Sequence, residues 1–141
     1  MSRAIDIMTD EPMTVPESAT VGQAVQVLQA LHVRHVPVVN EEGEVVGMLS
    51  DRDLRAIAIP RTLGDEWFGE LRVALETPIA RVMSSDVVTV QEQTATAEII
   101  ELMLENNVGA VPVVDAEGTL VGIVSYIDVL RELYELETAA E

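Results

Sequence analysis

The stretch Val36-Pro37-Val38-Val39 recurs 75 positions later as Val111-Pro112-Val113-Val114. The same offset needs no gap over most of the chain, where it pairs Met8 with Met83, Thr14-Val15 with Thr89-Val90, Val33 with Val108, Gly43 with Gly118, Gly47 with Gly122, Ser50 with Ser125 and Asp53 with Asp128. A fixed period of this kind indicates internal duplication. Two copies are too few for an open solenoid, so we expect their apolar faces to close on each other around a pseudo-two-fold axis.

Each copy has the pattern of a β-α-β-β-α unit. In the first copy an extended segment at 13–15 precedes Thr20, which with Gln23 forms a capping-box pattern for a helix. Two β-branched runs, 36–39 and 45–49, are joined by a turn in which Gly43 can take the left-handed conformation that a hairpin needs. A second helix starts at Ser50. The first two strands should be parallel across the helix, which predicts an α+β fold of two repeats packed sheet to sheet.

The first helix of each copy carries an apolar stripe at helical spacing. The stripes are Val21, Ala24, Val25, Leu28 and Leu31 in the first copy, and Ile99, Ile100 and Met103, widened by Leu102 and Leu104, in the second. Residues 60–78 form an insertion without a counterpart, in which the spacing of Trp67, Leu71 and Leu75 predicts a short linker helix lying on the core. The predicted division is two domains, 1–59 and 79–136, separated by the linker insertion 60–78 and followed by an acidic tail, 137–141.

Composition narrows the chemistry that the chain can perform. The 141 residues include no cysteine and only two histidines, which excludes disulfides and cysteine-ligated zinc and leaves too few ligands for a histidine-built metal site. The formal net charge of −17 predicts no nucleic-acid partner. Apolar runs are too short to span a membrane, and the N-terminus lacks the pattern of a secretion signal, so we expect a cytoplasmic protein with no membrane partner.

The stretch from Gly47 to Asp53 has the form Gly-x-x-Ser-x-x-Asp and is repeated from Gly122 to Asp128. One interpretation is structural, because Ser-x-x-Asp before an apolar helix is an ordinary capping box. The other is a ligand cradle, in which the helix N-terminus and the serine face a phosphate, the aspartate accepts ribose hydroxyls, and the glycine lets a ligand approach the backbone. The residues alone leave both interpretations open.

The chain resembles the paired cystathionine-β-synthase-type (CBS) domains known as a Bateman module. The resemblance rests on the Gly-hydrophobic-x-Ser-x-x-Asp motif, the hydrophobic-Pro-Val-Val run and the Met-Thr/Ser start, each present twice, and it covers all but the insertion and the tail. In that family the Ser/Thr and Asp hold phosphate and ribose of AMP, ADP, ATP or S-adenosylmethionine. The positions that the family pattern matches here are Ser50 and Asp53, Ser125 and Asp128, the glycines Gly47 and Gly122, and the adenine-pocket segments Arg34, His35, Val36 and Pro37, and Gly109, Ala110, Val111 and Pro112.

The resemblance implies a regulatory module rather than an enzyme, with no required cofactor. It also implies a homodimer, and an unidentified separate protein as the regulated target. A rival interpretation is a structural dimerisation or interaction module that binds no nucleotide. A catalytic role for His35 is disfavoured, because no reactive constellation surrounds it in the sequence.

The two copies differ in charge around the motif. The first has Arg34, His35, Arg52 and Arg55 where the second has Gly109, Ala110, Ile127 and Leu130. Guanidinium groups match phosphate oxygens well. We therefore hypothesise that the first site takes the charged end of a nucleotide, and that the second is empty or takes a less charged adenosyl group.

Overall fold

The computed structural model describes residues 2–31, 34–58 and 67–139. The chain forms two compact units, which we name after their motif serines. The Ser50 unit is Met13–Asp86, and the Ser125 unit combines Met1–Pro12 with Val87–Glu141.

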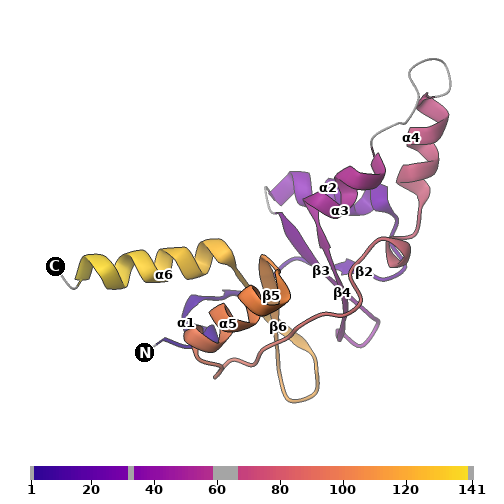
Figure 1. The fold of residues 1–141 in the computed structure, drawn as a ribbon. Helices are drawn as coiled ribbons and strands as arrows, with labels where there is room; N and C mark the ends of the chain where they lie inside the picture. The colour runs from indigo at the N-terminus through magenta and orange to yellow at the C-terminus, as the bar shows by residue number, and fades with distance from the viewer. Residues whose placement is uncertain (1, 32–33, 59–66, 140–141) are drawn as a thin grey trace. The chain divides into compact units, whose positions relative to one another are not determined.

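The Ser50 unit contains a three-stranded sheet and its helices (Figure 1). Its elements are β2 (Val15–Pro16), α2 (Val21–Leu31), β3 (His35–Val39), β4 (Val45–Ser50), α3 (Asp51–Ala58), α4 (Trp67–Glu76) and the 3-10 helix η1 (Ile79–Arg81). The sheet order is β2-β3-β4, with β2 parallel to β3 and β3 antiparallel to β4. This is the predicted β-α-β-β-α arrangement, with α2 as the crossover between the parallel strands.

The Ser125 unit repeats this plan, with strand β1 where the Ser50 unit has a single bridge at Ser84. Its elements are α1 (Ala4–Ile7), β1 (Thr9–Asp10), α5 (Thr96–Asn106), β5 (Ala110–Val114), β6 (Leu120–Ser125) and α6 (Tyr126–Ala139). The sheet order is β1-β6-β5, and a parallel bridge joins Val90 to Val113 where β2 joins β3 in the other unit. The predicted α+β fold of two similar repeats is confirmed.

The two hairpin turns have the predicted left-handed glycines, Gly43 at φ 80° and Gly118 at φ 85°. Side chains fix the turns as well. Asn40 Oδ1 accepts the N–H groups of residues 42 and 44, both at 3.0 Å, and Asp115 Oδ1 accepts those of residues 117 and 119 at 2.9 and 3.0 Å. An Asx side chain that bonds the backbone two residues on stabilises such a turn locally.

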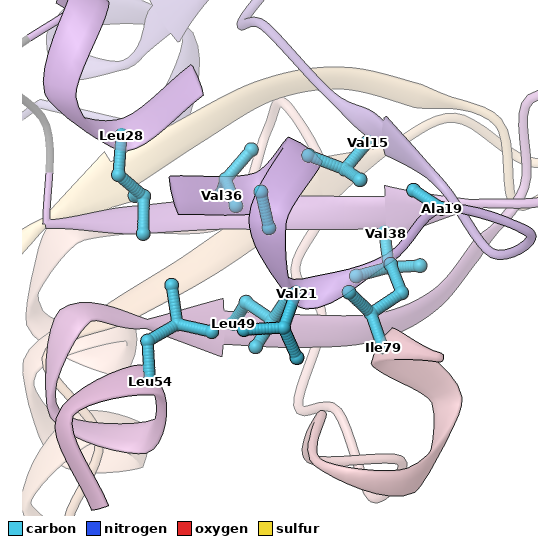
Figure 2. Packing of buried hydrophobic residues seen from close by; sticks show 10 residues of the cluster. Val15, Ala19, Val21, Leu28, Val36, Val38, Leu49, Leu54 and Ile79 are labelled. Atoms are coloured by element: carbon cyan, nitrogen blue, oxygen red, sulfur yellow. The ribbon is translucent and has the colours of Figure 1, made fainter. Parts of the chain in front are cut away.

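The apolar stripe of α2 faces the core of the Ser50 unit, as predicted. Figure 2 shows Val21 and Leu28 of α2 directed toward Val36 and Leu49 of the sheet, with Ile79 closing one end. In the Ser125 unit the stripe of α5 is narrower than predicted. Ile99 and Met103 are buried, but Leu104 is 78% exposed, because five residues after Ile99 it lies about 140° around the helix.

Each unit is completed by the leading segment of the other copy of the repeat. Thr9 pairs with Ile123 in β6, and Ser84 forms the equivalent bridge to Met48 in β4. Just before these positions, Ala4 and its repeat equivalent Ile79 are both 0% exposed, each within its own unit. The compact units therefore divide after Pro12 and after Asp86. The boundaries 1–59 and 79–136 describe the duplication in the sequence, and the folded units exchange the leading segments of the two copies.

Helix α4 occupies the insertion and lies against α2. Its Leu75 packs against the core of the Ser50 unit. A Cβ placed on Gly22 of α2 would be 3.2 Å from the carbonyl oxygen of Leu75, so the two helices approach closely at this glycine. The side chains of Trp67 and Phe68 lie outside the described part of the structure.

The two helical glycines give a test of this packing. Gly69 of α4 faces open space, so Gly69→Ala should raise the free energy of unfolding by up to about 1 kcal/mol through helix propensity. Gly22→Ala should gain less or lose stability, because the new methyl group crowds Leu75. Urea unfolding followed by circular dichroism measures both. Equal stabilisation by the two substitutions would show that α4 does not rest on Gly22.

Candidate functional site at the two Ser-x-x-Asp motifs

The first motif lies where β4 ends and α3 begins. The N–H of Ser50 donates to Asp53 Oδ2 at 3.0 Å, and the N–H of Asp53 donates to Ser50 Oγ at 3.1 Å. This reciprocal pair is a complete capping box. The structural interpretation of the motif is therefore confirmed in this unit, and a ligand role would have to use the atoms that the cap leaves available.

The second motif forms the same cap with one further bond. The N–H of Ser125 donates to Asp128 Oδ2 at 2.8 Å, and the N–H of Asp128 donates to Ser125 Oγ at 3.3 Å. The hydroxyl of Ser125 also lies 3.1 Å from Asp128 Oδ2, to which it can donate. The hydroxyl of Ser50 donates to no residue among those described. The two serines thus differ in whether a hydroxyl proton remains for a ligand.

The chain itself uses most of the N–H groups at the start of α3. The N–H of Asp51 donates to the carbonyl of Arg34 at 2.9 Å, and that of Asp53 is bonded to Ser50. Between them, the N–H of Arg52 has no partner in the described part of the chain. Since an α-helix leaves its first four N–H groups without intrahelical partners, an anion at this helix end would be bound by that N–H group and by side chains.

Strand β3 brings His35 to the motif. His35 and Ser50 are opposite each other in the β3–β4 register, and the equivalent pair in the other unit is Ala110 and Ser125. His35 is half-buried, and Arg34 beside it is exposed. The structure therefore brings four predicted residues together at one corner of the Ser50 unit: Arg34, His35, Ser50 and Asp53.

Other predicted site residues lie in the core. Val36 and Val111 are 1% and 0% exposed and belong to the apolar clusters of their units. Pro37 and Pro112 are equally inaccessible. The side chains of the valines contribute to packing, as Figure 2 shows for Val36, and the described structure gives no support for a direct adenine contact by them. The side chain of Arg55 lies outside the described part.

The motif glycines are covered by methionines. A Cβ on Gly47 would overlap the sulfur of Met83, and a Cβ on Gly122 would overlap the sulfur of Met8. The missing side chain thus makes room for a methionine of the exchanged segment, and the expected close approach of a ligand to Gly47 gains no support. Sequence reasoning missed these two contacts, although the repeat had already paired Met8 with Met83 and Gly47 with Gly122.

The charges around the two motifs differ as the sequence predicted. Beside the first motif, Arg34 and Arg52 balance Asp51 and Asp53. Burial lowers the pKa of His35 below its usual value, the charges of Asp51 and Asp53 oppose this shift, and Arg34 adds to it. The lowered pKa favours the neutral imidazole in the free protein. Beside the second motif, Asp128 lies 3.7 Å from Arg131, and the positions matching Arg34 and Arg52 are the uncharged Gly109 and Ile127.

Residues 2–31, 34–58 and 67–139 contain neither a candidate membrane span nor a candidate metal cluster. No helix there has both the length and the apolar character that crossing a membrane requires. Likewise, no three His, Asp or Glu side chains in these ranges converge as metal ligands do.

Comparison with known proteins gives a family match over both repeats. The CBS domain family model matches residues 4–59 and 79–135. The CBS domain-containing protein YhcV of Bacillus subtilis is 32% identical over 139 residues, which span 99% of this chain and 91% of that protein. Inosine-5'-monophosphate dehydrogenase of Methanocaldococcus jannaschii is 30% identical over 131 residues, but these span 93% of this chain and only 23% of the enzyme.

Solved structures agree with this match. CBSX2 in complex with AMP has a TM-score of 0.80 and 26% identity, covering 97% of this chain and 99% of that one. The CBS domain pair of protein MJ0100, solved with 5'-methylthioadenosine and S-adenosyl-L-methionine, has a TM-score of 0.76 and 26% identity, covering 94% and 99%. With both repeats matched by the family model and the whole fold shared with CBS pairs, the chain belongs to the CBS domain family as a tandem pair.

Proposed function

We propose that this chain is a regulatory module that binds an adenosine-containing ligand and signals its presence to a separate protein. The observation that carries the proposal is the grouping of Arg34, His35, Ser50 and Asp53 at the start of α3. The likeness to a CBS protein solved with AMP supports it. Signalling would be a population shift, in which the ligand favours the conformation that binds it better and the partner recognises that conformation.

Each residue has a role that is compatible with its capping bonds. Asp53 uses Oδ2 for the N–H of Ser50, which leaves Oδ1 to accept ribose hydroxyls. The hydroxyl of Ser50 donates to phosphate, and the guanidinium groups of Arg34 and Arg52 supply the countercharge. These groups favour AMP, ADP or ATP at the Ser50 site. The Ser125 site lacks both arginines and would be empty or take a less charged ligand such as S-adenosylmethionine.

The substitutions Asp53→Ala and Asp128→Ala test the proposal as a matched pair, because each removes the carboxylate that accepts the N–H of its cap serine, at a cost of about 1 kcal/mol. Asp128→Ala also removes the contacts with Ser125 Oγ and Arg131. Asp53→Ala should weaken AMP and ATP binding at least tenfold, which is about 1.4 kcal/mol. Asp128→Ala should change the affinity for AMP and ATP less than about twofold. Asp128 belongs to the other unit, and substitutions at independent sites affect each other little. Isothermal titration calorimetry with AMP, ATP and S-adenosylmethionine gives the affinities, and thermal unfolding checks the fold.

Two outcomes would contradict different parts of this picture. An equal loss of ATP affinity in both variants would overturn the assignment of the phosphate to the Ser50 site. If no adenosyl ligand binds or raises the melting temperature of the wild-type protein, the chain is instead a structural interaction module that binds no nucleotide.

The wider setting follows from the family and the composition. We infer a non-catalytic protein that acts in the cytoplasm as a homodimer, without nucleic acid or membrane partners. Exposed apolar side chains support self-association through α6, where Ile127, Leu130, Leu133, Tyr134 and Leu136 are 45–69% exposed. The regulated protein is a separate polypeptide in this proposal.

A further inference from the structure

His35 stands out because it is a titratable side chain placed directly beside a proposed anion site. It faces Ser50 across the β3–β4 pair and is half-buried. The repeat equivalent, Ala110, faces Ser125 in the same register and cannot ionise. The difference is confined to one of two otherwise closely matched caps.

The charged groups around His35 come from two segments. Arg34 immediately precedes strand β3, and α3 contributes Asp51 and Asp53, with the exposed Arg52 between them. The other elements packed against β3 are β2, α2 and β4, and none of them contains a charged residue. Of these groups, Asp51 and Asp53 raise the pKa of His35 and Arg34 lowers it, so an anion bound beside His35 would add to the effect of the two carboxylates.

We propose that His35 links ligand binding at the Ser50 site to protonation, taking up a proton when a phosphate-bearing adenosyl ligand binds. The inference rests on the proposed function, and it adds His35 to the residues that distinguish a nucleotide from an unphosphorylated nucleoside. A ligand at the Ser125 site, which has Ala110 at this position, would bind without proton uptake there.

The direction of the pH dependence follows from linkage. In the free protein, burial keeps the pKa of His35 low and favours the neutral imidazole. A phosphate dianion nearby favours the imidazolium and raises this pKa in the complex. Between the two pKa values binding takes up a proton, so affinity rises as the pH falls, by at most about tenfold per pH unit for one proton. The phosphate itself titrates near pH 6, so the useful range lies above about pH 6.5.

Calorimetry of the full chain with AMP and with adenosine, between pH 6.5 and 8.5, tests the inference. For the wild type we expect the affinity for AMP to rise at least threefold over this range as the pH falls. Proton uptake should appear as a binding enthalpy that depends on the buffer, while adenosine shows neither effect. His35→Gln should abolish both effects. His32→Gln is the matched control, because it removes the only other histidine and should leave both effects in place.

A histidine NMR titration of the wild type avoids any folding defect of the variant. Addition of AMP should raise the pKa of His35, and adenosine should leave it unchanged. AMP binding with the same pH dependence in the wild type and in His35→Gln, or an unmoved pKa, would overturn the inference while leaving the proposed function intact. Absence of AMP binding at every pH would instead overturn both.

Discussion

Deletion of residues 1–12 should unfold the Ser125 unit, although this segment is separated in sequence from the rest of the unit by the whole Ser50 unit. Ala4 is 0% exposed within the core of the Ser125 unit, and Ile7 and Met8 pack against that core. The backbone is engaged as well, since the N–H of Ala4 donates to the carbonyl of Thr94 at 2.8 Å. The deletion therefore removes both core side chains and a strand.

The expected loss is on the order of 5 kcal/mol. Fully burying a large apolar side chain contributes roughly 1.5–3 kcal/mol. The deletion removes the partly buried Ile7 and Met8, the fully buried Ala4 and the backbone hydrogen bonds of the segment. Strand β6 would also lose its partner β1 and present an unpaired edge. Since domains are stable by only about 5–15 kcal/mol, a loss of this size is enough to unfold the unit.

Hydrogen exchange resolved along the chain by mass spectrometry would show where protection is lost. We expect amides of β5, β6 and α5 to exchange rapidly after the deletion, and those of β3 and β4 to stay protected. Removal of the tail, 137–141, is the control, because residues 137–139 are exposed and should be dispensable. Protection lost first from β3 and β4 would mean that residues 1–12 support the Ser50 unit instead.

The elements of each repeat were predictable because local signals determine them. The Thr20 capping box is present, with the N–H of Thr20 bonded to Gln23 Oε1 at 2.9 Å. The glycine turns and the parallel crossover also follow from short-range chemistry and handedness. Leu104 was assigned to the stripe because α5 is apolar on more than one side, and periodicity alone could not decide which side is buried.

The exchange of leading segments could not be predicted from the repeat. An offset shows which residues are equivalent, but it does not show which sheet each segment joins. Both sheets have a strand glycine that leaves room for a methionine, so Met8 and Met83 fit either one by local chemistry. Chain connectivity and the rest of the packing decide between them, and these are properties of the whole fold.

The capping bonds of the motif serines and aspartates are compatible with the proposed ligand contacts. A capping carboxylate needs one oxygen for the backbone, as Asp53 Oδ2 shows, and the proposed ligand contact of Asp53 uses the other oxygen. The sequence left a helix cap and a ligand site as alternatives, because the spacing of residues does not show which side-chain oxygen atoms accept the capping hydrogen bonds. Discrimination between the two sites must therefore come from residues outside the shared motif, of which Arg34 and His35 are the ones that the structure places beside it.

Substitution of the motif glycines should destabilise the protein through the methionines above them. A Cβ at Gly47 would overlap Met83, and overpacking of this kind costs about 1–3 kcal/mol. A Cβ at Gly122 would overlap Met8 and also lie 3.1 Å from the carbonyl oxygen of Thr9. That carbonyl belongs to the paired strand β1 and cannot move aside as a side-chain end can. Gly122→Ala should therefore cost more than Gly47→Ala.

Double-mutant cycles identify the partner of each glycine. Met83→Ala opens the space above Gly47, so Gly47→Ala should cost little in that background, with a coupling energy of about 1–2 kcal/mol. Met8→Ala should rescue Gly122→Ala only in part, because the Thr9 carbonyl remains. The crossed pairs are the controls, and urea unfolding supplies the free energies. Rescue of Gly47→Ala by Met8→Ala would contradict the reciprocal exchange, because each glycine would then be covered by the methionine of its own copy.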